Sequence, residues 1–351
     1  MRPSGLDHRS LPGPRSLPGA RALASGLSGL TGIAATGRLP LPSRDDVRAL
    51  LAQPLLGPRT LPIRDRSPDP GLFGPDSVTW RVMREPALIL GGGRALLMQA
   101  AHPLVAQGAI DHSTYATDPW GRLNRTTEWV TQVAFGTTAE AERATGFVNR
   151  LHSRVSGDLP GAHATRRMRR GRRYSAIDPR LLLWVHLSFV DTMLVAHDAL
   201  VGGLTPRDRD AFVEEWRPVG RLLGIPERLL WRTQGAMRSH LLGAIDGGEV
   251  APGAGSRLVA RTVLRPPLPS GVLRPAFDAG AFVSVGLLPA AVRRGYGITW
   301  TPAHAATHRA LCLWLRTTGG ALPGRLKRSP VWDFAVRRSE GRLAGLAVLA
   351  S

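Results

Sequence analysis

The longest apolar stretch in the chain is LLLWVHLSFVDTMLVAH, residues 181–197. It follows Asp178-Pro179, a pairing in which a capping residue precedes a proline suited to the first position of a helix. The stretch contains an aspartate and two histidines, and it is shorter than the roughly 20 apolar residues that a membrane span needs. It therefore predicts a buried helix at the centre of a globular fold and no transmembrane segment.

Helical periodicity continues on both sides of this stretch, from Asp76 onward. Few segments alternate as strands do, and no internal repeat is visible. The expected helix starts are a capping box at Thr137 and Glu140 and the pairs Thr205-Pro206 and Thr301-Pro302; the expected ends include Gly136 and Gly157. The pattern predicts an all-α fold, with one multi-helix domain over residues 76–351.

The first 75 residues differ from this pattern because they are rich in Pro, Gly and Arg. They predict a weakly ordered leader over residues 1–75. The leader contains no apolar signal-peptide core ahead of a small-residue cleavage site. We therefore expect the protein to act in the cytoplasm.

The charge balance is strongly basic, with 46 basic against 26 acidic residues and a formal net charge of +20. All the basic residues except Lys327 are arginines, and the densest run is RRMRRGRR, residues 166–173. Such a charge favours contact with nucleic acid or an anionic surface. The run has no interleaved aromatic residues for base stacking, which favours a solvated loop and no specific nucleic-acid binding. A basic helical nucleic-acid-binding protein is the alternative of a different class.

Several catalytic and metal-binding patterns are absent from the sequence. Cys312 is the only cysteine, so the chain has no intramolecular disulfide, no Cys-rich zinc site and no C-x-x-C-H attachment for haem. It has no G-x-S-x-G and no E-x-x-H. The triple glycine at 91–93 lacks the third glycine of a dinucleotide-binding turn, and we interpret it as a place where helices approach closely. The pair His304 and His308 indicates an ordinary surface helix.

A cluster of polar residues occurs in RLNRTTEW, residues 122–129. On a helix, Arg122, Arg125, Thr126 and Trp129 fall at positions i, i+3, i+4 and i+7, and therefore on one face. Apolar residues on both sides of that face predict partial burial. A buried guanidinium needs an anionic partner, and haem propionates, phosphate or nearby carboxylates would each serve.

A histidine within an apolar helical stripe is the second candidate. In FVNRLHSRVSG, residues 147–157, His152 lies among Val148, Leu151 and Val155. His186 has the same character in the long apolar stretch. A histidine on such a face is usually a core residue satisfied by a backbone carbonyl, and an iron ligand is the alternative.

Four blocks of the sequence together resemble one known family: GRALLMQAAHPLVAQGAIDHS, DPWGRLNRTTEWV, FGTTAEAERATGFVNRLHSRVSG and YSAIDPRLLLWVHLSFVDT. With a weaker tail, ALPGRLKRSPVWDFAVRR, they resemble the MpaB-type oxygenases that share the rubber oxygenase (latex-clearing protein) catalytic domain. The likeness covers roughly residues 76–340, and the order and spacing of the blocks carry it.

This resemblance implies an all-α protein with a globin-like core around haem b. The proximal iron ligand would be His152, with His186 as the alternative, and Nδ1 of His152 would be held by the Val148 carbonyl or the Asn149 side chain. The family's Arg-x-x-Lys-Thr motif falls on Arg122, Arg125 and Thr126, which would be the catalytic residues. Residues expected to contact the haem are His152, Arg122, Arg125, Trp129 and Leu151.

The sequence departs from that family in two places. The motif's lysine is Arg125 here, and arginine keeps its proton and cannot ligate iron, so it would hydrogen-bond dioxygen or a propionate instead. No acidic residue clearly matches the one that assists rubber cleavage; Gln107 and Asp111 are the nearest in sequence. The expected function is a haem b-dependent, dioxygen-using oxygenase that cleaves a carbon–carbon double bond in an apolar substrate, with isoprenoids as candidates. A sensor or peroxidase-like haem protein is the alternative.

Overall fold

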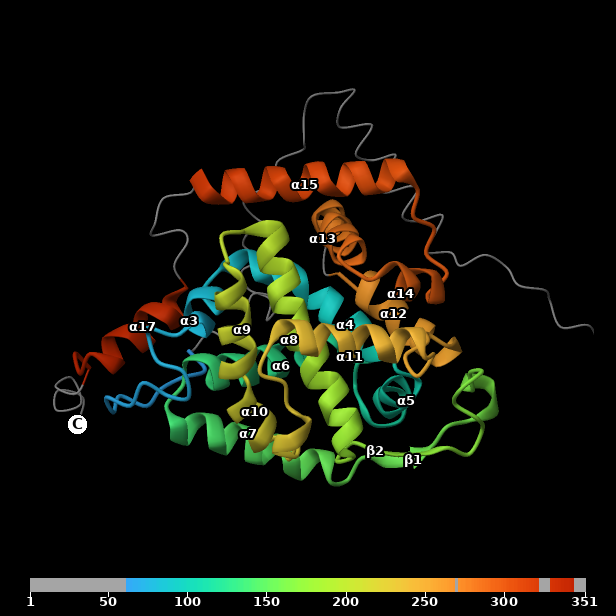
Figure 1. Cartoon of the computed structure of the whole chain (residues 1–351), viewed down its shortest axis with the longest axis horizontal. Helices are drawn as coiled ribbons and strands as arrows, with labels where there is room; N and C mark the ends of the chain where they lie inside the picture. Colours follow the sequence, from blue (N-terminus) through green and yellow to red (C-terminus); the bar gives the residue numbers. More distant parts are fainter. Residues whose placement is uncertain (1–60, 269–270, 322–328, 344–351) are drawn as a thin grey trace, which may run out of the picture. The chain divides into compact units, whose positions relative to one another are not determined.

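The long apolar stretch forms α8, Pro179–Leu200, at the centre of the computed structural model (Figure 1). The structure describes residues 61–268, 271–321 and 329–343. The Asp178 side chain caps α8 by accepting a hydrogen bond from the Arg180 backbone N–H, with Pro179 in the first helical position. Among described helices only α8 is long and apolar enough to cross a membrane, yet 72% of its apolar window is buried inside the protein. The predicted core helix is confirmed.

The other described elements surround α8 and confirm an all-α fold. Before it come α3 (Val78–Met83), η2 (Pro86–Gly91), α4 (Gly92–Ala100), α5 (Pro103–His112), α6 (Pro119–Phe135), α7 (Thr138–His152), β1 (Ser156–Asp158), η3 (Gly161–His163) and β2 (Arg173–Ser175). After it come α9 (Pro206–Glu215), α10 (Arg217–Leu222), η4 (Glu227–Leu229), α11 (Gln234–Asp246), α12 (Ala254–Leu264), η5 (Gly271–Leu273), α13 (Arg274–Gly286), α14 (Ala290–Gly295), α15 (Pro302–Ala321) and α17 (Pro330–Ser339). In the described ranges the only sheet is the hairpin of β1 and β2.

The triple glycine lies where η2 and α4 pack closely against neighbouring helices, as predicted. A Cβ on Gly91 would lie 2.9 Å from the Ala196 Cβ of α8. A Cβ on Gly93 would lie 2.5 Å from the Ser284 Oγ of α13. Any larger residue at either position would push α4 away from its neighbours, so the glycines set how closely these helices pack.

A buried ion pair joins α4 to α8 at this contact. Arg94 Nη2 lies 2.5 Å from Asp191 Oδ2, and both side chains are almost completely buried. Arg94 also donates to the Thr192 hydroxyl at 2.5 Å and to the Leu287 carbonyl at 2.9 Å. The second carboxylate oxygen of Asp191 lies 3.4 Å from Arg238 Nη1. The aspartate inside the apolar stretch is therefore explained by a charge partner from α4.

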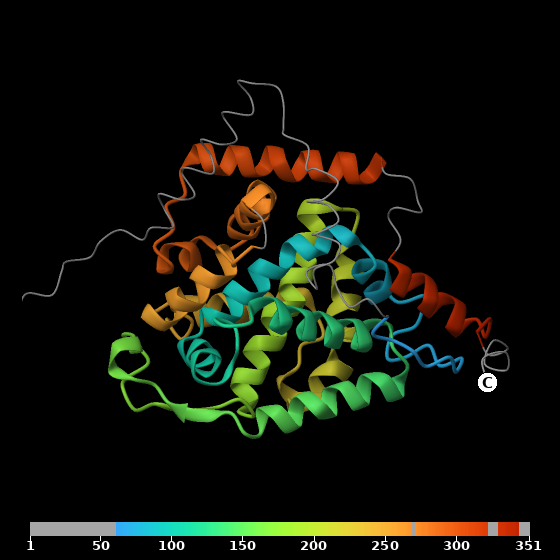
Figure 2. The same ribbon diagram turned by 180° about the vertical axis from the view of Figure 1, so that it is seen from behind.

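Helices α6 and α7 form an antiparallel hairpin on one side of α8, visible in Figure 2. The turn between them contains Gly136 and the predicted capping box, in which Thr137 and Glu140 bond each other's backbone N–H. The turn is further held by Arg338 of α17, which donates to the Phe135 carbonyl at 2.9 Å. Because the closed end of the hairpin is fixed in this way, its open end brings the start of α6 near the end of α7.

The end of α7 differs from its expected position at Gly157. The helix ends at His152, and residues 156–158 form β1, which pairs antiparallel with β2. Gly157 pairs with Tyr174, and a Cβ on Gly157 would lie 2.6 Å from the Tyr174 hydroxyl. Gly157 pairs with a residue 17 positions further along the chain, and this is a non-local interaction that the rules for helix ends do not include. The arginine run, residues 166–173, falls in the loop between the two strands and at the start of β2, and most of its side chains are exposed, as predicted.

The expected leader lies mainly outside the described residues, which begin at residue 61. Residues 61–75, the last part of that expected leader, pack against the helices. Ile63 is buried in a cluster with Trp80 and Phe135, and Glu140 Oε1 accepts hydrogen bonds from the backbone N–H groups of Arg64 and Asp65. The packed chain therefore includes the last part of the Pro-rich segment.

We predict that Asp191→Ala lowers the free energy of unfolding by about 3–5 kcal/mol, because it leaves the Arg94 guanidinium buried without its charge partner. The measurement is denaturant unfolding followed by circular dichroism. The matched control is Asp76→Ala, which removes an exposed carboxylate and should change stability by less than about 0.5 kcal/mol. Equal stability of the two variants would show that the ion pair contributes nothing to the fold.

Candidate functional site

His152 occupies the last residue of α7 and is half-buried. Its Nδ1 atom is buried and has no hydrogen-bond partner among the described residues. Burial, and next the positive charge of Arg122, lower the pKa of His152 below its ordinary value of 6.5. The ring is therefore neutral at pH 7, which is the protonation state that a metal ligand requires.

The expected support for Nδ1 is absent. The Asn149 side chain donates instead to the Leu222 carbonyl at 2.8 Å, and the Val148 carbonyl makes no bond to the ring. The apolar stripe also differs from the expectation, because Leu151 is 49% exposed and Val155 lies beyond the end of the helix. His152 is thus at the edge of the core, close to the surface.

Arg122 lies on the first turns of α6, at the open end of the α6–α7 hairpin. It is half-buried, and burial lowers the pKa of its guanidinium, with a smaller contribution from Arg125. Its Nε donates to the Ser113 hydroxyl at 2.6 Å. No carboxylate among the described residues lies within ion-pair distance of it. A partly enclosed cation without an anionic partner is a site that can accept an anion from outside the protein.

The predicted polar face of α6 is divided by the structure. Arg125 is exposed, donates to the Thr114 hydroxyl at 3.0 Å and lies 3.4 Å from the Asp118 carboxylate. Thr126 is exposed as well and donates to the Arg122 carbonyl at 3.0 Å. The residues share one side of the helix, as predicted, but only Arg122 combines burial with proximity to His152.

Trp129 continues this face one turn further along α6. Its Nε1 donates to the Thr145 hydroxyl of α7 at 3.3 Å, and its ring packs against the main core. Val133 is fully buried in the same core, whereas Leu151 is at the surface. The apolar residues of α6 and α7 therefore mainly hold the two helices against each other and the core, and they do not line one common cavity.

His186, the alternative ligand, lies on α8 against the Trp216 ring, with centroids 6.3 Å apart. Burial lowers its pKa to about 4, and no charged group contributes. The positive charge of Arg122 therefore acts on His152, whereas no charged group acts on His186. In the described ranges, no group of three or more His, Cys, Asp or Glu side chains forms a metal site.

Gln107 and Asp111, the residues nearest in sequence to the family's acidic position, both form hydrogen bonds within the protein. The Asp111 carboxylate accepts from Gln107 Nε2 at 2.8 Å and from the Tyr174 hydroxyl at 2.5 Å. The Gln107 carbonyl oxygen in turn lies 2.6 Å from His163 Nδ1. This network joins α5 to the β1–β2 hairpin, so Asp111 is held as a structural acceptor and not as a free general base.

Sequence reasoning did not identify Ser113 as part of the site. It is the C-cap of α5, and it positions the guanidinium of Arg122 nine residues later. The signal available was its place in AIDHS, within one of the blocks that carry the resemblance. Its partner could not be read from helical spacing because the two residues lie on different helices.

These features describe an all-α protein with a neutral imidazole at the open end of a helical hairpin. Beside it lies a partly buried arginine that has no carboxylate partner among the described residues. The chain matches the family "ER-bound oxygenase mpaB/B'/Rubber oxygenase, catalytic domain" over residues 80–317, well over half of its length, and it belongs to that family. It is an oxygenase by family.

Two curated relatives were found in mycobacteria. An uncharacterised protein of Mycobacterium tuberculosis and one of Mycobacterium bovis are each 23% identical to this chain over 256 residues, which cover 70% of this chain and 96% of the relative. No solved structure matches the chain significantly. The family match confirms the resemblance that the four sequence blocks indicated.

We predict that Arg122→Ala raises the pKa of His152, because the variant removes the cation that opposes protonation of the ring. The measurement is an NMR pH titration of the His152 ring. The matched control is Arg125→Ala, one turn away on the same helix, which should leave this pKa close to that of the wild type. If both variants shift the pKa equally, the two side chains are not arranged around the ring as described.

Proposed function

We propose that the protein is a haem b-dependent oxygenase that cleaves a carbon–carbon double bond of an apolar substrate with dioxygen. The observation that carries this proposal is the pairing of His152 and Arg122 at the open end of the α6–α7 hairpin. The family supplies the reaction class, and its name includes a rubber oxygenase. Isoprenoid chains are therefore the first substrates to test.

Two properties of the described residues fit a haem. His152 has a buried ring nitrogen without a hydrogen-bond partner, and coordination of a metal is one way to satisfy a neutral imidazole. Arg122 has no carboxylate partner among the described residues, and a haem propionate would provide one through a charge-assisted bond. One property differs from most ligating histidines, in which the ring nitrogen that does not bind the metal donates to an acceptor, because no hydrogen bond from the His152 ring is formed to a described residue.

The chain's own residues would hold the group as follows. His152 would bind the iron, and Arg122, positioned by Ser113, would neutralise a propionate. Haem b, when bound, would supply activation of dioxygen at its iron. Arg125 is exposed one turn from Arg122, and a guanidinium is a donor that does not ligate metal, so it would add positive charge at the mouth of the site.

The proposed reaction balances without an added reductant. One carbon–carbon double bond is broken, and the two atoms of dioxygen become the oxygen atoms of two carbonyl products. An alkene chain carries no charge, so it would be bound by apolar contacts and shape. As part of this proposal, we also place the protein in the cytoplasm.

We predict about one haem b per chain, bound through His152. The test is expression with added haem of three proteins, the wild type, His152→Ala and His186→Ala, followed by measurement of the Soret absorbance. His152→Ala should lose the band, because the residue that would bind the iron is removed, and His186→Ala should keep it. The reverse result would move the ligand to α8, and a colourless wild type after haem addition would refute haem binding.

We also predict two carbonyl fragments from each alkene that the protein cleaves. Haem-loaded protein would be incubated with farnesyl-type lipids and short polyisoprenes, under air and under nitrogen, and carbonyls would be trapped and identified. Products should form only under air, and His152→Ala should form none. A haem-loaded protein that gives no carbonyl product from any alkene would contradict the cleavage reaction and favour the sensor or peroxidase-like alternative.

A further inference from the structure

A dense patch of positive charge adjoins the end of α7. Between Phe147 and Arg180 the chain has nine arginines and only two carboxylates, Asp158 and Asp178. We call this segment the basic face. It runs from the second half of α7 through β1, the arginine loop and β2 to the first residues of α8, along the lower edge of Figure 1.

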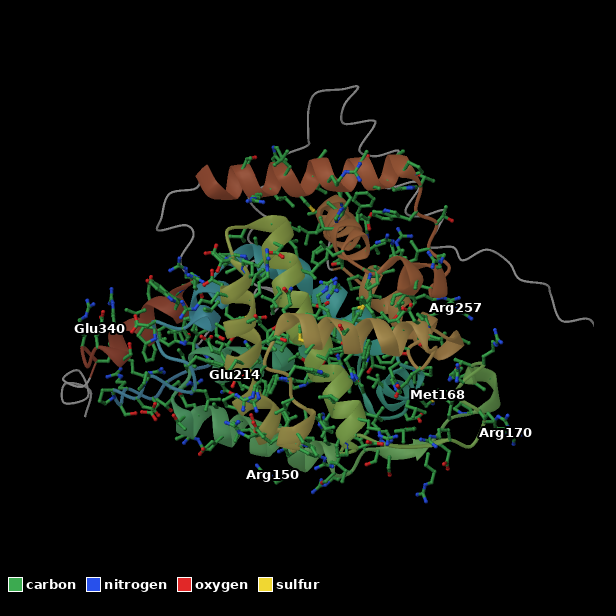
Figure 3. All side chains as sticks on the ribbon, viewed as in Figure 1. Arg150, Met168, Arg170, Glu214, Arg257 and Glu340 are labelled. Atoms are coloured by element: carbon green, nitrogen blue, oxygen red, sulfur yellow. The ribbon has the colours of Figure 1, made fainter. Side chains whose placement is uncertain are left out.

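Most of these arginines are exposed and lack an acidic partner. The one ion pair of the segment is the contact of Arg173 with Asp158, at 4.0 Å between side chains that are both largely exposed. Asp178 is occupied as the cap of α8. In Figure 3, Arg150 and Arg170 lie at the lower edge and at the lower right. The charge is therefore available to a partner outside the described chain.

Exposed apolar side chains accompany this charge. Phe147, Leu151 and Ile177 are 54%, 49% and 53% exposed. Phe147 and Leu151 are one turn apart on the same side of α7, with Arg150 and Arg154 beside them. Ile177 is close to the end of α7 because the Ala176 N–H donates to the Val155 carbonyl at 2.9 Å. Large apolar side chains are thus exposed near the arginines at the end of α7.

The arginine loop also lines a hollow of about 660 Å³ with the end of α11. Arg167, Arg169, Arg170 and Arg172 contribute to it, and Glu249 is the one carboxylate among the lining residues. Such a hollow is large enough for a phosphate-bearing headgroup, and its net charge is positive. It extends the basic face around the tip of the hairpin.

We propose that the basic face docks the protein on an anionic phospholipid bilayer. Arginines would bind the headgroup phosphates, and the three apolar side chains would enter the boundary between headgroups and acyl chains. Nucleic acid would satisfy the arginines equally well, but it would leave Leu151 and Ile177 without a favourable environment. The combination of charge and exposed aliphatic side chains therefore favours a lipid surface.

Docking in this orientation has a consequence for the site. Leu151 and His152 are adjacent residues in the last turn of α7. The open end of the α6–α7 hairpin would then face the bilayer, where an apolar substrate is dissolved. The docking inference rests on the charge and the exposed side chains, and it does not depend on haem or on the proposed cleavage reaction.

The test is co-sedimentation of the full chain with vesicles, either of phosphatidylcholine alone or of phosphatidylcholine with phosphatidylglycerol. Binding to the anionic vesicles is expected, and it should weaken as salt is added. Arg169→Glu/Arg170→Glu should reduce the partition coefficient roughly 25-fold or more, since each arginine near an anionic surface contributes about fivefold. Phe147→Ser/Ile177→Ser should reduce it at least about fivefold, because apolar contact with the bilayer is lost.

The matched control is Arg207→Glu/Arg309→Glu, which makes the same change in net charge at exposed positions of α9 and α15. It should change binding by less than about threefold, because these positions lie outside the basic face and distant charges are screened. If Arg169→Glu/Arg170→Glu fails to fold, as judged by circular dichroism, Arg166→Glu/Arg167→Glu replaces it.

Three results would overturn the proposal. One is equal binding to neutral and anionic vesicles. Another is an equal loss of binding in the control variant, which would show that only total charge matters. The third is binding to duplex DNA that is tighter than binding to anionic vesicles at the same salt concentration and is lost in Arg169→Glu/Arg170→Glu, because the basic face would then be a nucleic-acid surface.

Discussion

The ion pair between Arg94 and Asp191 constrains the rest of the structure, because two charges enclosed in a protein core require each other. Burial lowers the pKa of Arg94, and the Asp191 carboxylate opposes this effect and keeps the guanidinium charged. The remaining donors of Arg94 are occupied by Thr192 and by the Leu287 carbonyl. Helix α4 can therefore lie against α8 in one position only, and the small residues Gly91 and Gly93 allow it to come that close.

The candidate site is connected to this contact through a short series of neighbours. Trp184 of α8 donates to the Met98 carbonyl at 3.1 Å, which holds the end of α4. Two residues after α4 ends, His102 caps α5 by accepting the Leu104 N–H. Helix α5 then ends at Ser113, whose hydroxyl binds Arg122. The direction of the Arg122 guanidinium thus depends on how α4 and α5 pack, although both helices precede the motif in sequence.

Features that depend on neighbours in sequence could be predicted. The start of α8 follows from Asp178-Pro179, and the capping box follows from the three-residue spacing of Thr137 and Glu140. The buried partner of Asp191 could not be predicted, because Arg94 is almost a hundred residues earlier. The end of α7 was misplaced for the same reason, since the pairing of β1 with β2 decides it.

The site could be predicted only in part, and the reason is the same difference between local and distant contacts. Helical spacing placed Arg122, Arg125 and Thr126 on one side of α6, which the structure bears out. Spacing within one helix cannot show which of those residues is enclosed, because enclosure depends on α5 and α7. The proximity of Arg122 to His152 requires the whole α6–α7 hairpin, and before the structure only the family resemblance indicated it.

The many arginines of this chain differ in burial and in bonding partner. Comparing them on these two properties identifies the candidate site. Arg94, Arg217 and Arg338 are buried and each has a carboxylate within 4.0 Å, so they hold the fold together. The half-buried Arg257, Arg274 and Arg293 donate to backbone carbonyls. The arginines of residues 166–173 are mostly exposed to solvent. Arg122 belongs to none of these groups: it is partly enclosed, its bond is to one hydroxyl, and its positive charge helps to lower the pKa of His152. A guanidinium in that state has unused capacity for an anion, which is why the site is assigned here and not at any other cluster of charge in the described chain.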